Sequence, residues 1–148
     1  MWVLFYTNLP SPYRVDFFNL LGKSVELTVV FTAHRDQNVG WVQGNEDIRN
    51  FKAIFLCDSD RQPVNRPKYS YPDAIRFALG DWDAIFVTNY SSPTEILLIR
   101  SLKQRRIPYI LEVDGGFVRE ESGIKRQLKK YLVSGAKYYL STGNMTDD

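Results

Sequence analysis

The sequence predicts an α/β fold: a Rossmann-like, doubly wound and mainly parallel sheet with helices on both faces. Apolar runs rich in β-branched and aromatic residues alternate with amphipathic segments, which is the pattern of βαβ units. The first run, Trp2–Thr7, is continuously apolar rather than alternating, as expected of a strand buried on both faces of a parallel sheet. At 148 residues, the chain has the length of one domain and can bury a sizeable core.

Ten elements are expected along the chain. The strands are Trp2–Thr7, Val25–Thr32, Phe51–Cys57, Asp83–Thr88, Tyr109–Val113 and Lys137–Ser141. The helices are Pro12–Leu21, Pro72–Leu79, Pro93–Arg106 and Ile124–Val133. Ser11 is suited to cap the first helix and Gly22 to end it, while Ser91 or Ser92 caps the third. The aperiodic segments between these elements are expected to be loops.

Several common functions of α/β proteins lack their motifs here. Neither a dinucleotide-binding glycine pattern nor a phosphate-binding P-loop follows a predicted strand. One histidine, His34, and one cysteine, Cys57, argue against a zinc site, an internal disulfide and a Ser-His-Asp triad. The net charge of +2 gives no sign of nucleic-acid binding. We therefore expect no metal and no nucleic-acid partner.

The candidate ligand site is a group of three loops. In a doubly wound sheet, the loops after the first, fourth and fifth strands open on one crevice, where the strand order reverses. These loops are rich in groups that hydrogen-bond to sugars or phosphates. The candidate substrate-binding residues are Asn8, Ser11, Arg14, Asn89, Ser91, Gly115, Gly116 and Arg119. The short polar side chains among them could equally serve as helix caps or turn formers.

The fifth strand stops abruptly at Asp114, followed by Gly115 and Gly116. The two glycines let a ligand approach the main chain closely. Asp114 stands where parallel sheets place their ligands, so it is the candidate catalytic residue, accepting a hydrogen bond from a substrate hydroxyl or acting as a base. A simple Asp-Gly turn accounts for the same residues without function. Both interpretations remain open.

Basic residues concentrate in the last third of the chain. Residues 100–137 carry a net charge of +6, and the remainder carries −4. In the predicted helix Ile124–Val133, basic residues lie between apolar residues spaced four apart, as in an amphipathic basic helix. These basic residues are Lys125, Arg126, Lys129 and Lys130. The helix is either a solvated face or a contact for anionic lipid or a phosphate-rich acceptor. The N-terminus lacks the pattern of a signal peptide, so we expect a cytoplasmic location, with peripheral contact at the inner face of the membrane if the helix binds lipid.

Three segments in order resemble the N-terminal half of family 4 glycosyltransferases, which are retaining enzymes of GT-B architecture. The segments are Asn8–Phe18, Ile110–Gly116 and Lys137–Gly143, and the resemblance extends over essentially the whole chain. It implies that residues 1–148 form one Rossmann-like domain, the acceptor-side half of a two-domain enzyme truncated near residue 148. A C-terminal domain would bind a nucleotide-sugar donor, and the sugar would pass to a glycan or lipid-linked acceptor, as in polysaccharide biosynthesis. The resemblance implies no cofactor, and no activity for this half alone.

The sequence also departs from the family pattern. Leu9, Pro10 and Ser11 stand where many relatives carry Gly-Gly, and Asp114 stands where many carry histidine. The resemblance therefore transfers no catalytic residue. Two other classes of function remain open: a stand-alone α/β module that binds a sugar or anion without catalysis, and a basic adaptor at a membrane surface.

Overall fold

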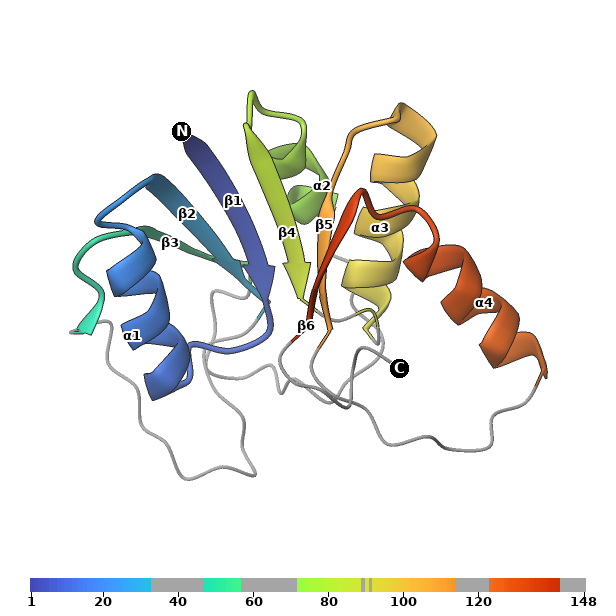
Figure 1. Ribbon diagram of the computed structural model, residues 1–148, viewed down its shortest axis with the longest axis horizontal. Coiled ribbons are helices and arrows are strands. Elements are labelled where there is room, and N and C mark those ends of the chain that lie inside the picture. Colours follow the sequence, from blue (N-terminus) through green and yellow to red (C-terminus); the bar gives the residue numbers. More distant parts are fainter. Residues whose placement is uncertain (33–46, 57–71, 89, 91, 114–122, 142–148) are drawn as a thin grey trace.

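In the computed structural model, six strands form one all-parallel sheet (Figure 1). The structure describes residues 1–32, 47–56, 72–88, 90, 92–113 and 123–141. The strands are β1 (Trp2–Thr7), β2 (Glu26–Phe31), β3 (Lys52–Phe55), β4 (Ala84–Thr88), β5 (Ile110–Val113) and β6 (Tyr138–Ser141). The helices are α1 (Pro12–Leu21), α2 (Pro72–Ala78), α3 (Pro93–Arg105) and α4 (Gly123–Val133).

This architecture confirms the predicted Rossmann-like, doubly wound fold. All ten predicted elements are present, with ends within two residues of the expected ones. The largest shift is in β3, which is Lys52–Phe55 rather than Phe51–Cys57. Its observed bounds match its pairing, because Thr28 to Phe31 of β2 are in register with Lys52 to Phe55.

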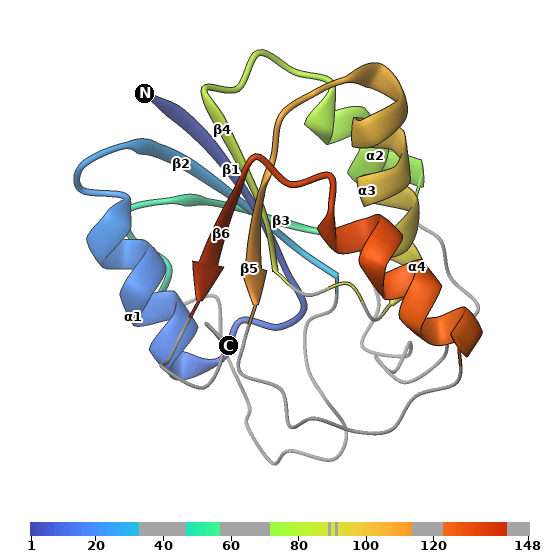
Figure 2. The ribbon, with the colours of Figure 1, turned by 45° about the vertical axis from the view of Figure 1, so that its right-hand side comes forward.

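The helices cover both faces of the sheet. Helix α1 lies on one face, and α2, α3 and α4 lie on the other (Figures 1 and 2). Because successive strand residues point to opposite faces, β1 contributes to both cores. Val3 and Phe5 pack with α1, whereas Leu4 and Tyr6 pack with the other three helices. The α1 side is strongly aromatic: Phe18 is fully buried and meets Phe5 edge-to-face, with ring centroids 5.0 Å apart.

The strand order β3-β2-β1-β4-β5-β6 reverses direction between β1 and β4. The chain moves from β1 towards β3 on one side, and from β4 towards β6 on the other. Right-handed crossovers then place α1 and α3 on opposite faces of the sheet. The connections that leave β1 and β4 therefore diverge, and doubly wound proteins bind their ligands at this position.

Gly22 ends α1 as predicted, and glycine is favoured there for a steric reason. Gly22 has a φ of −65°, which any residue can adopt. A side chain would instead be obstructed, because a Cβ at Gly22 would lie 1.9 Å from the carbonyl oxygen of Asn50. The glycine thus lets the segment before β3 pass directly against the end of α1.

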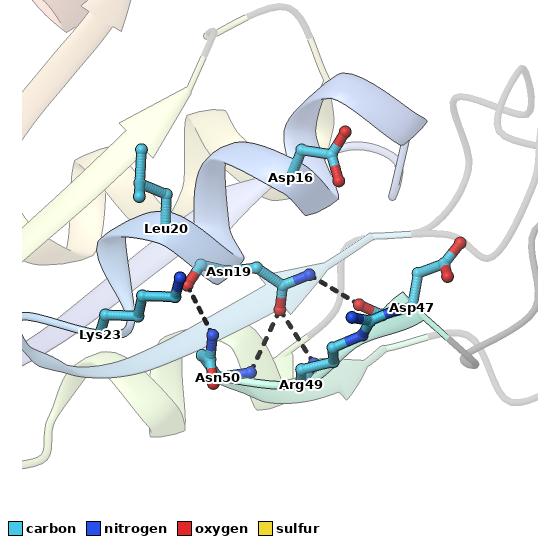
Figure 3. A pocket seen from close by; sticks show the side chains of 7 residues that line it. All are labelled: Asp16, Asn19, Leu20, Lys23, Asp47, Arg49 and Asn50. Atoms are coloured by element: carbon cyan, nitrogen blue, oxygen red, sulfur yellow. Dashed lines mark hydrogen bonds between the residues drawn. The ribbon is translucent and has the colours of Figure 1, made fainter.

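Asn19 ties α1 to the same segment (Figure 3). Its side-chain oxygen accepts hydrogen bonds from the backbone N–H groups of Arg49 and Asn50, at 2.9 and 3.1 Å. Its side-chain nitrogen donates to the carbonyl of Asp47 at 2.6 Å. A surface hollow of about 320 Å³ lies over this seam. Since the Asn19 amide is already paired within the protein, we assign the hollow to the packing of α1 rather than to ligand binding.

Replacing Gly22 by alanine should destabilise the fold by roughly 1–3 kcal/mol, because the backbone of Asn50 must move away from the new methyl group. Gly123→Ala is the matched control. That glycine opens α4 with no atom within 4 Å of its Cβ position, so the change should be neutral or stabilising by up to about 1 kcal/mol. Urea unfolding followed by circular dichroism measures both. Equal stability of the two variants would contradict the steric role of Gly22.

Candidate functional site

A buried ion pair lies at the carboxyl edge of the sheet. The Nη1 atom of Arg14 lies 2.8 Å from both carboxylate oxygens of Glu112. The residues are 98 positions apart in the sequence and are only 7% and 4% exposed. Arg14 comes from the first turn of α1, and Glu112 from β5. The pair therefore connects a helix on one side of the strand-order reversal to a strand on the other.

Thr88, the last residue of β4, completes this buried cluster. Its hydroxyl donates to Oε2 of Glu112 at 2.7 Å. Thr88 and Glu112 are register partners on neighbouring parallel strands, so their side chains point to the same face of the sheet. Charge-assisted hydrogen bonds of this kind are stronger and more directional than neutral ones. Glu112 is thus held from two directions, by α1 and by β4.

The sheet order explains why an arginine makes this contact. Strand β4 lies between β1 and β5, so β5 is roughly 10 Å from β1 in the plane of the sheet. The helix that follows β1 can reach β5 only with a long side chain. Arg14 spans this distance from the start of α1 and carries the charge that the buried Glu112 needs.

Ser11 adds an unusual polar group close to the ion pair in sequence. It occupies the N-cap position of α1 and is 5% exposed, but its side chain makes no capping hydrogen bond. Within the ranges that the structure describes, its Oγ is a buried side-chain oxygen with no hydrogen-bond partner. Leaving a buried hydroxyl unpaired costs free energy. Ser11 stands at a helix N-terminus, a position at which proteins commonly bind anions.

The remaining predicted residues divide into two groups. Asn8 lies at the expected edge but binds its own turn: its side-chain oxygen accepts from the backbone N–H of Leu9 at 2.8 Å. Arg14 also lies there, but it is buried against Glu112. Its direct contact with substrate stays a prediction. The other candidates lie outside the described residues; they are Asn89, Ser91, Asp114, Gly115, Gly116 and Arg119.

The choice between Ser91 and Ser92 as a helix cap is resolved in favour of Ser92. Its side chain accepts from the backbone N–H of Glu95, and the Glu95 side chain accepts from the backbone N–H of Ser92. This reciprocal pair is a capping box. The two predicted N-cap serines therefore differ, since Ser92 caps α3 with its side chain and Ser11 leaves its hydroxyl unpaired at α1.

Sequence reasoning missed Glu112 and Thr88 as members of the site. A signal for Glu112 was present, because it is the one charged residue in the otherwise apolar run Tyr109–Val113. A carboxylate in a buried strand requires a partner. Thr88 gave no comparable signal, because threonine is an ordinary strand residue.

The described part of the chain lacks two other features. There, no group of three or more His, Cys, Asp or Glu side chains is arranged to hold a metal ion. Among those same residues, no helix combines the length and apolar character needed to cross a membrane.

Comparison with known proteins adds no family. No protein-family model matches the chain, and no match is found among curated proteins. The glycosyltransferase resemblance therefore stays a prediction, and the geometry at the strand-order reversal is the main guide to function.

The stability losses from removing the two partners of the buried pair should not be additive. Glu112→Leu leaves the Arg14 charge without its partner carboxylate and should cost roughly 3–5 kcal/mol of unfolding free energy. Arg14→Met should cost a similar amount. The double variant should cost clearly less than the sum of the two, because neither charge remains. Urea unfolding of the four proteins gives the coupling energy, and strictly additive losses would contradict a direct buried pair.

Ser11 and Ser92 should respond differently to alanine. Ser92→Ala removes a working cap and should cost about 1 kcal/mol. Ser11→Ala removes a buried hydroxyl that has no partner among the described residues, so stability should change by less than about 0.5 kcal/mol or rise. Thermal unfolding of the two variants in parallel distinguishes these roles. A loss at Ser11 as large as that at Ser92 would mean that the Ser11 hydroxyl supports the fold.

Proposed function

We propose that this chain is the acceptor-side domain of a retaining glycosyltransferase, which moves a sugar from a nucleotide-sugar donor to a glycan or lipid-linked acceptor. The observation that supports this most is the polar cluster of Arg14, Glu112 and Thr88 beside the unpaired Ser11 hydroxyl, at the strand-order reversal. Doubly wound sheets bind their ligands at this position.

The described residues suit a rigid, polar ligand. The ion pair and Thr88 fix the relative position of α1, β4 and β5, and thereby the points from which the three candidate loops leave the sheet. The N-terminus of α1 carries a partial positive charge, and Ser11 adds a hydroxyl there. A sugar hydroxyl or a phosphate oxygen could use both.

Asp114 is the proposed reactive group of this domain. It directly follows Val113, the last residue of β5, two positions after the anchored Glu112. In the proposed reaction, its carboxylate accepts a hydrogen bond from the acceptor hydroxyl and so orients that oxygen for attack on the donor sugar. As the acceptor oxygen bonds to the anomeric carbon, the bond from that carbon to the donor phosphate breaks, and the nucleotide leaves with the hydroxyl proton. The donor itself would be held mainly by a second domain, as the family resemblance implies.

The alternative is a sugar- or anion-binding module without catalysis. The polar residues at the strand-order reversal fit this function equally well, because binding a sugar or an anion there needs no chemistry. The two functions differ in how tightly these residues alone should bind a ligand. A stand-alone module binds its ligand tightly through these 148 residues. An acceptor-side half binds a nucleotide sugar only weakly by itself.

In the full-length protein, Asp114→Ala should lower sugar transfer by at least about tenfold, because it removes the proposed acceptor-orienting group, while leaving the melting temperature unchanged. The assay presents radiolabelled UDP- and GDP-hexoses with a lipid and glycan extract as acceptor. Asp73→Ala, at an exposed acid of α2, is the control and should transfer normally. Unchanged turnover in Asp114→Ala would mean that Asp114 only forms a turn. Absence of any transfer by the wild-type protein would argue against the proposed enzyme.

A further inference from the structure

Helix α4 is attached to the rest of the fold by its C-terminal end. Leu132 is its buried residue. Side chains from three other elements or their flanks bind the carbonyl groups of its last turn: Lys103 binds Tyr131, Tyr109 binds Leu132 and Tyr139 binds Val133. These bonds satisfy carbonyls that have no partner within a helix. The end of α4 is therefore well anchored.

The first turns of α4 project from this anchor. Every residue from Gly123 to Tyr131 is exposed. Ile124 is 83% exposed and Leu128 is 45% exposed, although both lie in the same stripe as the buried Leu132. The apolar stripe is thus buried at the C-terminal end of α4 and exposed to solvent towards its N-terminal end. In Figures 1 and 2, α4 lies at the outer edge of its helical layer, beyond α3.

The surroundings of this projecting stripe are strongly basic. Residues 100–137 carry ten lysines and arginines against four acids, of which one, Glu112, lies in the described part of the chain. That acid is buried and paired with Arg14, so it offers no exposed negative charge. The basic face of α4 is formed by exposed side chains, namely Lys125, Arg126, Lys129 and Lys130.

We infer that the projecting turns of α4 dock on an anionic lipid surface. Exposed Ile124 and Leu128 would enter the boundary between headgroups and acyl chains, and the basic face would bind anionic headgroups. A fluid surface suits this helix, because it accepts isolated apolar side chains without needing a complementary groove. The inference depends on α4 alone and stands apart from the proposed glycosyl transfer.

Docking in this way would bring the carboxyl edge of the sheet, where the candidate site lies, towards the membrane. A helix that follows a parallel strand begins at the carboxyl edge of the sheet, and α4 follows β5. Its projecting turns therefore lie at the edge that carries Thr88 and Glu112, towards which the strand arrowheads point in Figure 1. A substrate embedded in the membrane would meet the protein on this side.

Vesicle flotation of the protein tests the inference. It should bind vesicles of equal parts phosphatidylglycerol and phosphatidylcholine, bind pure phosphatidylcholine poorly, and lose binding as salt rises from about 0.05 to about 0.5 M. Reversal of the basic face to glutamate should weaken binding by at least about tenfold. Ile124→Ser with Leu128→Ser should weaken it by about tenfold at unchanged net charge. Circular dichroism verifies that each variant is folded.

Matched control variants show whether vesicle binding depends on α4 itself or only on the net charge and exposed apolar residues of the whole protein. Reversing four exposed cations elsewhere, Lys23, Arg49, Lys52 and Arg76, changes the net charge equally and should leave most binding intact. Leu20→Ser with Leu79→Ser, also at exposed sites, should bind as the wild type does. The inference is overturned if the wild type ignores anionic vesicles at low salt, or if both charge-reversed variants lose binding equally. It is also overturned if α4 instead mediates a dimer, seen by ultracentrifugation and lost in the Ile124/Leu128 variant.

Discussion

The geometry of the candidate site, at the carboxyl edge of the sheet, depends on the buried contact between Arg14 and Glu112. It connects the two halves of a doubly wound sheet at the point where their connections diverge. A buried ion pair is seldom the cheapest way to stabilise a core, since apolar side chains of similar size often serve as well. We therefore attribute this pair to positioning. It fixes the start of α1 relative to β5, and Thr88 adds β4 to the same arrangement.

The core on the α1 face holds α1 in place. On the α1 face, Phe5, Phe18 and Phe31 interlock as rings, and Asn19 fastens α1 to the segment before β3. Helix α1 is therefore held along its length, and its N-terminus can carry an unsatisfied Ser11 and a buried Arg14 without shifting. A candidate site with costly polar groups needs rigid support of this kind.

The fold could be predicted from the sequence because the relevant signals are local. Apolar runs, proline and serine at helix starts, and glycine at helix ends place all ten elements within two residues. The site could be predicted only in part. The expected sheet order indicated which loops should meet, but the partner of Arg14 lies 98 positions away, and no local pattern links the two residues. The roles of Ser11 and Gly22 could not be predicted from the sequence either. Ser11 makes no capping hydrogen bond, and Gly22 is needed because the backbone of Asn50 passes close to it.

Strand β5 connects the candidate site to the proposed membrane helix. Glu112 lies near its carboxyl end, while Tyr109, just before its first residue, donates to the carbonyl of Leu132 at 3.0 Å and so holds the end of α4. Burial, with smaller effects from Tyr139 and Tyr131, raises the pKa of Tyr109 to about 12. Its hydroxyl therefore remains a hydrogen-bond donor throughout the neutral range. The contact that holds α4 and the buried ion pair are thus only three positions apart in the chain, at Tyr109 and Glu112.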